Sequence, residues 1–247
     1  MNNRLALLSL ALAGACSAQA DSDYEGDLLA SLDGQVTSSR EVATPDAEAM
    51  AIWLPLDDYE FLVPTTDRVD VEGSFPSAFR LDLTEPPPHE GSIDGTGSIA
   101  IGILTVASAD LTQEDILQED GPPEGLLLGV EENHMLLWIG DGGPGTTFAD
   151  MYGFTTLAPG YHVLDVLGIP KAEEDQVDAC RDAALSEEDD EQCTQLERGF
   201  YEQHHPDETW DGDVLLDKIR VAADDLDAEL AIDLKDSLSE MNFPEFD

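Results

Sequence analysis

Short segments with strand-like patterning recur along most of this chain, and they restrict it to a mainly β fold. Residues 69–73 and 79–83 alternate apolar and polar side chains, the period of a strand with one buried face. Residues 98–106 are longer and almost wholly apolar, as in a central strand. The same patterning predicts strands at residues 31–37, 49–54, 125–130, 134–139, 151–156, 161–167, 214–221 and 228–234. We therefore predict an antiparallel β-sandwich.

The period changes between residues 171 and 203. Apolar positions there recur at intervals of three and four, the spacing of one helix face, at Val177, Cys180, Ala184, Cys193, Leu196 and Phe200. This predicts two acidic helices, broken near residues 186–190 and inserted between late strands of the sandwich. An alternative organisation is two stacked small β domains that divide near residues 109–121.

The chain has three cysteines, and two of them lie in this helical segment. We predict a disulfide between Cys180 and Cys193 that clamps the two helices as a hairpin. On the chain-entropy model, closing so short a loop stabilises the fold by about 3 kcal/mol. A free thiol nucleophile is the alternative, but it needs a nearby histidine that no pattern indicates.

Residues 1–20 have the pattern of a secretory signal peptide. Arg4 precedes a short apolar run, and small residues follow it up to Ala20. Cleavage after Ala20 would release a soluble, secreted or periplasmic chain. Residues 13–16 instead resemble a bacterial lipobox, which would make Cys16 a lipidated first residue. We favour that lipid anchor, with Ser17 pointing to the outer membrane, residues 21–30 as a tether and residues 31–247 as the folded domain.

The charge balance limits the classes of partner. Fifty-five acidic residues face ten basic ones, and the formal net charge is −45. Such a field repels phosphate backbones and anionic lipid headgroups, which excludes nucleic-acid binding. A solvated surface adapted to saline surroundings explains the acidity better than multivalent cation binding, because the acids are spread along the chain.

Few residues in the sequence suggest chemistry. His204 and His205 are candidate ligands for zinc or another transition metal, although a polar segment that ends the helical hairpin is the better interpretation. Asp207, Asp211 and Asp213 are candidate calcium ligands without the order of an EF-hand loop. No cofactor is otherwise indicated. No sequence motif of nucleophilic catalysis is present either, so we predict no catalytic residue.

Part of the chain resembles a known family. GQVTSS, AMAIWLP, VDVEGSFPSAFRLDL and GSIAIGILTV, within residues 31–106, are similar to the transthyretin-like, immunoglobulin-type sandwich of uncharacterised exported bacterial lipoproteins of deltaproteobacterial type. The resemblance implies a fold and a location and supplies no catalytic residue.

These features predict an exported, lipid-anchored envelope protein that binds a partner or has a structural role. Two other classes remain open. One is a secreted hydrolase whose site is built from scattered carboxylates and histidines. The other is a calcium-stabilised adhesion module.

Overall fold

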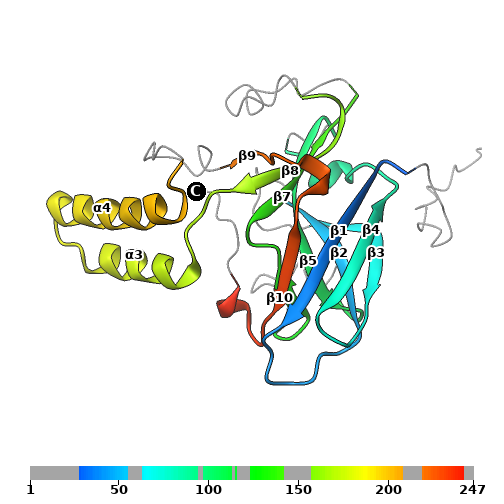
Figure 1. The fold of residues 1–247 in the computed structure, drawn as a ribbon, viewed down its shortest axis with the longest axis horizontal. Helices are drawn as coiled ribbons and strands as arrows, with labels where there is room; N and C mark the ends of the chain where they lie inside the picture. The colour runs from blue at the N-terminus through cyan, green and yellow to red at the C-terminus, as the bar shows by residue number, and fades with distance from the viewer. Residues whose placement is uncertain are drawn as a thin grey trace, which may run out of the picture.

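The computed structural model describes residues 28–54, 63–93, 97–112, 115, 123–141, 157–207 and 219–241. The signal peptide, Cys16 and residues 21–27 of the tether lie outside these ranges. Within them the protein is mainly β, with two sheets and one helical hairpin, so the predicted fold class is confirmed (Figure 1). No described helix has the length and apolar character needed to cross a membrane.

The smaller sheet has the strand order β10 (Leu230–Leu234), β1 (Ala30–Ser38), β4 (Ser77–Leu83). The predicted alternation of β4 is confirmed, because Phe79, Leu81 and Leu83 are buried while the residues between them are exposed. β1 and β10 are parallel, whereas every other strand pair among the described residues is antiparallel. The two partners come from opposite ends of the chain, so no local turn signal could indicate their direction.

The larger sheet has the order β3-β2-β5-β7-β8-β9, and β6 also pairs with β5. Its strands are β2 (Ala47–Leu54), β3 (Val63–Val71), β5 (Ile99–Ser108), β6 (Leu127–Val130), β7 (His134–Ile139), β8 (Gly160–Val166) and β9 (Ile219–Val221). β5 is buried at all ten of its positions, which confirms its predicted central place. Strands from both sides of residues 109–121 therefore share one sheet. The predicted strand at residues 151–156 lies outside the described residues.

Two apolar cores cover the two faces of the larger sheet. The first lies between the sheets and contains Trp53, Leu104 and Leu136 with Leu32 and Leu81 of the smaller sheet. The second lies on the opposite face and is built on the alternate residues of β2, β5 and β7. The near-continuous apolar runs of β2 and β5 follow from this arrangement, because both faces of these strands are buried.

The helical hairpin consists of α3 (Lys171–Ala183) and α4 (Glu187–His204), coloured yellow-green and yellow-orange in Figure 1. It is inserted between β8 and β9, which pair with each other at its root. The predicted position of the insertion is therefore confirmed. The predicted break between two helices is confirmed, but it lies at residues 184–186 and not at 186–190, because α4 already begins at Glu187 with Ser186 as its N-cap. The acidic residues predicted to lie in the break belong to the first turn of α4. The helix dipole favours carboxylates at that end of a helix.

Candidate functional site

The hairpin has a very small core of its own. Val177, Cys193 and Tyr201 are almost fully buried, while most other positions of both helices are exposed. The predicted disulfide joins Cys180 to Cys193, with their Cα atoms 5.6 Å apart. Two short helices bury too little apolar surface to hold each other firmly, so the covalent bond supplies much of what keeps them together.

Polar pairs fasten the helices at two further levels. Arg181 on α3 and Glu197 on α4 form an ion pair with a nitrogen–oxygen distance of 2.7 Å. At the base of the hairpin, His204 Nε2 lies 2.8 Å from Glu173 Oε2. The Glu173–His204 pair lies at the base of the hairpin, and the Arg181–Glu197 pair lies next to the disulfide near its tip, so these contacts fix how α3 and α4 pack along most of their length.

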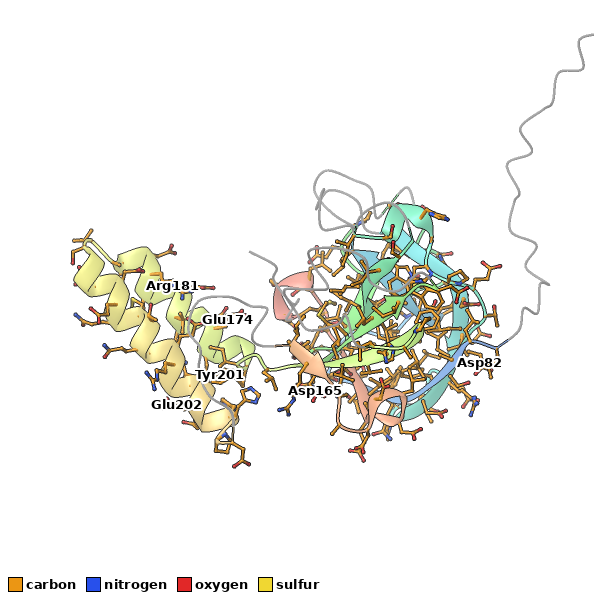
Figure 2. All side chains as sticks on the ribbon, turned by 90° about the horizontal axis from the view of Figure 1, so that it is seen from above. Asp82, Asp165, Glu174, Arg181, Tyr201 and Glu202 are labelled. Atoms are coloured by element: carbon orange, nitrogen blue, oxygen red, sulfur yellow. A yellow bond between two sulfur atoms is a disulfide. The ribbon has the colours of Figure 1, made fainter. Side chains whose placement is uncertain are left out.

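The hairpin projects away from the sandwich. Figures 1 and 2 show α3 and α4 side by side to one side of the two sheets, and the helices pack mainly against each other. The start of β1 lies at the other end of the molecule, beside Asp82 in Figure 2. The sandwich core is complete without the helices, since neither core contains a residue of the hairpin.

The loop between the helices has a defined structure and an exposed leucine. Ser186 Oγ accepts from the Asp189 backbone N–H at 3.2 Å, which caps the first turn of α4, and donates to Asp189 Oδ2 at 2.7 Å. Leu185 donates its backbone N–H to the same carboxylate at 3.2 Å. Its side chain is 95% exposed, the most exposed of the large hydrophobic residues that the structure describes.

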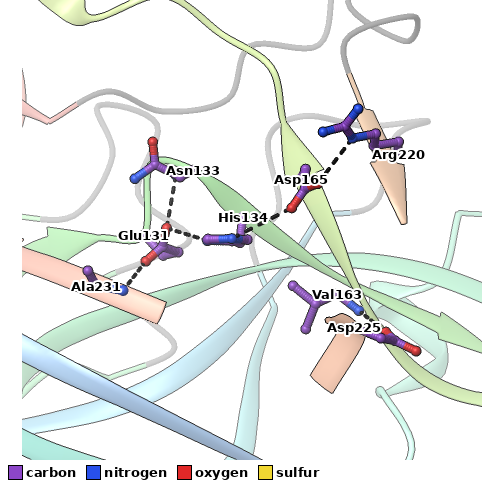
Figure 3. A network of polar contacts seen from close by, with 8 residues as sticks. All are labelled: Glu131, Asn133, His134, Val163, Asp165, Arg220, Asp225 and Ala231. Atoms are coloured by element: carbon purple, nitrogen blue, oxygen red, sulfur yellow. Dashed lines mark hydrogen bonds and ion pairs between the residues drawn. The ribbon is translucent and has the colours of Figure 1, made fainter. Parts of the chain in front are cut away.

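A second candidate is a chain of polar contacts across the sandwich at the root of the hairpin (Figure 3). It begins at Glu131, whose side chain is fully buried. Glu131 Oε1 accepts from Asn133 N at 2.9 Å, and Oε2 accepts from Ala231 N at 2.6 Å. The carboxylate therefore satisfies a backbone donor of β10 and ties the smaller sheet to the turn that precedes β7.

The contacts continue from Glu131 to β8 and β9. His134 Nδ1 lies 3.0 Å from Glu131 Oε1, and His134 Nε2 lies 3.7 Å from Asp165 Oδ1. Asp165 Oδ2 in turn pairs with Arg220 Nε at 3.1 Å. The hydrogen bond to Glu131 raises the pKa of His134; burial opposes this rise, and the charges of Glu131 and Asp165 add to it. This environment favours an imidazolium between two carboxylates, so the chain of contacts is charge-balanced.

Asp225 makes a separate set of contacts with β8. Its backbone has φ 48°, a left-handed conformation that Asp adopts more readily than most residues. Asp225 Oδ1 accepts from Val163 N at 2.9 Å, while Oδ2 lies 3.3 Å from His162 Nδ1. The other nitrogen of His162 lies 2.8 Å from the carbonyl oxygen of Ala158. Beyond the end of β9, the Asp225 carboxylate therefore accepts the hydrogen bond from a backbone N–H of β8. This role is structural.

Of the predicted metal ligands, the structure describes His204, His205 and Asp207, and the two histidines contact different partners. His204 contacts Glu173, whereas His205 Nε2 lies 2.7 Å from the carbonyl oxygen of Gly168. Asp207 is exposed, and Asp211 and Asp213 lie outside the described residues. Within the described ranges, no group of three His, Cys, Asp or Glu side chains could hold a metal ion.

The chain of contacts that runs from Glu131 through His134 and Asp165 to Arg220 was not anticipated from sequence. One local signal exists, since Glu131 and His134 are three residues apart at the start of a strand. The rest depends on register: Asp165 pairs with His134 across β7 and β8, and with Arg220 across β8 and β9. Cross-strand neighbours are visible only once strand order is known.

No protein-family model matches this chain, and neither a curated protein nor a solved structure matches it. The functional argument therefore rests on the geometry of the hairpin and of the sandwich that carries it.

Proposed function

We propose that this chain is an exported protein, anchored to the outer membrane through Cys16, that acts by binding another component of the cell envelope through its helical hairpin. The observation that carries the proposal is the disulfide-clamped hairpin, which projects from a sandwich whose core is complete without it. Such an element adds little to the stability of the sandwich, and binding is the role that best accounts for it.

The disulfide supports export. Disulfides form and persist in oxidising compartments and are rare in the cytosol. Cys180 and Cys193 are the two cysteines that remain when Cys16 is set apart, and they are bonded to each other. An exported chain with this pairing agrees with the signal-peptide pattern of residues 1–20.

The positions of the two ends of the molecule support presentation of the hairpin. The start of β1, which pairs with β4 beside Asp82, lies opposite α3 and α4 in both views (Figures 1 and 2). A lipid on Cys16 would attach the chain through the end of the sandwich opposite the hairpin. The helices would then be left for another envelope component to bind.

We also propose that residues 31–106 belong to the transthyretin-like sandwich family of exported bacterial lipoproteins. In support of this, the segments that carry the resemblance contribute β1, β2, β4 and β5, strands of two facing sheets around a shared core. The family would supply the scaffold, and the hairpin would be the part specific to this protein.

The anchor is tested in cells that produce the full chain. We expect radiolabelled palmitate to enter the protein and globomycin to leave an unprocessed precursor. The control is Cys16→Ser, which abolishes labelling while Cys180 and Cys193 stay oxidised. Absence of label with an unchanged precursor size in globomycin would contradict the anchor and leave a secreted or periplasmic protein.

The binding role is tested by excising the hairpin. A short Gly-Ser linker can replace Lys171–His204, because Gly168 and His205 are in contact at its base. We expect a folded, exported sandwich that loses the adducts formed by the intact chain under chemical cross-linking in whole cells. A purified protein that hydrolyses glycans, esters or peptides equally well with and without the hairpin would contradict the proposal and favour the hydrolase alternative.

A further inference from the structure

The local structure of the hairpin leaves Leu185 without the apolar partner that a hydrophobic staple would supply. Leu185 directly precedes the N-cap Ser186, at the position where an apolar side chain usually packs against the fourth residue of the helix. That residue is Asp190, which is exposed and offers no apolar partner. The leucine is therefore left 95% exposed in the loop between α3 and α4, at the end of the hairpin farthest from its root.

The loop holds Leu185 in a fixed place. Its backbone N–H donates to the Asp189 carboxylate, and the same carboxylate accepts from the hydroxyl of the N-cap Ser186. The disulfide between Cys180 and Cys193 clamps the helices on either side of the loop. An anchor residue whose backbone is already positioned loses less conformational entropy when a partner binds it.

Charge decides which occupant fits this end of the hairpin. Between Lys171 and His204 the chain carries twelve carboxylates against three cationic side chains, at Lys171, Arg181 and Arg198. Asp182 and Asp190, on either side of Leu185, are both exposed. A second copy of this chain, with its net charge of −45, is repelled, and so is an anionic lipid surface. A cationic protein surface is complementary and is drawn towards the hairpin from a distance.

We propose that residues 182–190, the docking tip, insert into an apolar pocket with a basic rim on a partner protein, and that Leu185 fills the pocket. This rests on the proposed function, an exported protein that binds through its hairpin, and it names the anchor residue and the chemistry of the partner. Leu185 supplies the desolvated contact at the centre, while Asp182 and Asp190 face the basic rim, the arrangement of a buried anchor within a polar ring.

The test uses the full chain in the cells that export it. The photoreactive residue p-benzoyl-phenylalanine is placed at exposed Ala183, next to the anchor, or at exposed Ala78 of β4 as a position control. Each is combined with Leu185, with Leu185→Ser, or with Val42→Ser. Val42 is a matched control because it is an exposed aliphatic residue, 57% exposed, on the sandwich.

We expect one discrete adduct from position 183 and none from position 78, and mass spectrometry should identify a partner with an excess of Lys and Arg. Leu185→Ser should lower the yield of this adduct about tenfold, as for an anchor residue, while Val42→Ser leaves it unchanged. An acidic partner, an adduct with a second copy of this chain, or a yield that Leu185→Ser does not change would each overturn the inference. So would the absence of any adduct at position 183.

The same strains separate this inference from the proposed function. The oxidation state of Cys180 and Cys193 and the labelling of Cys16 report whether the chain is exported and anchored. The chain could be exported and disulfide-bonded and need its hairpin for cross-linking, while Leu185→Ser leaves the adduct yield unchanged. That result would overturn only the role of the docking tip. A chain with reduced cysteines in the cytosol would overturn the proposed function.

Discussion

At the scale of single residues, Glu131 does the most to join parts of the fold that are distant in sequence. Its two carboxylate oxygens contact Asn133 N, His134 Nδ1 and Ala231 N, so a fully buried charge is satisfied by three donors. Burying a carboxylate is tolerated only when it is paired and hydrogen-bonded in this way. The free energy of unfolding should therefore depend strongly on this one side chain.

Replacing Glu131 with Gln should lower the free energy of unfolding by about 3 kcal/mol, because the amide removes the charge and one of the two acceptor oxygens. Urea denaturation of the purified mature protein measures the change. Glu229→Gln makes the same chemical change at an exposed position next to β10 and should stay within about 0.5 kcal/mol of wild type. Equal losses in the two variants would show that Glu131 has no special structural role.

His134 should make this part of the fold sensitive to pH. Its hydrogen bond to Glu131 raises the pKa in the folded protein, so the folded state binds the proton more tightly than the unfolded chain. The resulting stabilisation is fully present below the unfolded pKa of about 6.5 and is lost as pH rises through the folded pKa. His134→Gln should therefore cost more stability at about pH 5.5 than at about pH 9.

The comparison is made by urea denaturation at both pH values. In a Glu131→Gln background the pH dependence of the His134→Gln effect should largely disappear, because the main cause of the raised pKa is gone. A His134→Gln effect that is the same at both pH values would contradict the role of His134 as a charged bridge.

Gly102 is a residue-scale requirement of the core. A Cβ atom at this position would lie 2.7 Å from Cε3 and 2.9 Å from Cζ3 of Trp53, inside the fully buried strand β5. Gly102→Ala should cost about 2 kcal/mol through overpacking, measured as a lower unfolding midpoint. Gly73→Ala is the matched control, since a Cβ there meets nothing within 4 Å. A Gly102→Ala variant as stable as wild type would mean that Trp53 can move aside.

At the scale of elements, the hairpin and the sandwich are stabilised by different means. The sandwich is stabilised by two apolar cores that involve nearly all its strands. The hairpin has a few buried side chains, one disulfide and ion pairs such as Arg181–Glu197. Its stability should therefore be separable from that of the sheets.

Replacing Cys180 and Cys193 together with Ser should release the hairpin and leave the sandwich intact. The loss of about 3 kcal/mol should raise amide exchange rates in α3 and α4 by about a hundredfold. Hydrogen-exchange mass spectrometry measures both elements in one sample, and the strands of β5 and β7 serve as the internal control. An equal rise in exchange in these strands would show that the two parts unfold together.

At the scale of the whole molecule, charge is the dominant feature. A net charge of −45 makes the folded chain repel itself, and salt screens that repulsion. The described cations are mostly paired with carboxylates, as in Arg68–Glu48, Arg80–Asp82 and Lys235–Asp233, so little positive charge is left to offset the surplus.

The melting temperature should therefore rise as NaCl is raised from about 0.05 to about 1 M, with KCl giving the same gain because the effect is screening. Differential scanning calorimetry measures it. A melting temperature that falls with NaCl would contradict the self-repulsion account. At equal ionic strength, a larger gain with CaCl2 than with MgCl2 would favour the calcium-stabilised alternative, through sites such as Asp211 and Asp213.

Much of this fold could be predicted from sequence, because its information is local. The alternation in β4, the apolar run of β5 and the change to helical spacing after Lys171 each reflect how neighbouring side chains are buried. The pairing of Cys180 with Cys193 followed from the number of cysteines and their place in the hairpin.

Tertiary structure alone decided what depends on segments far apart in the chain. The parallel pairing of β1 with β10 joins the two ends of the domain, and Glu131 finds its partner at Ala231 across that arrangement. The exposure of Leu185 likewise depends on tertiary structure, because the helices on either side of it pack mainly against each other and not on the sheets. Local patterning reports whether a side chain is buried, whereas strand order and register decide which distant group it meets.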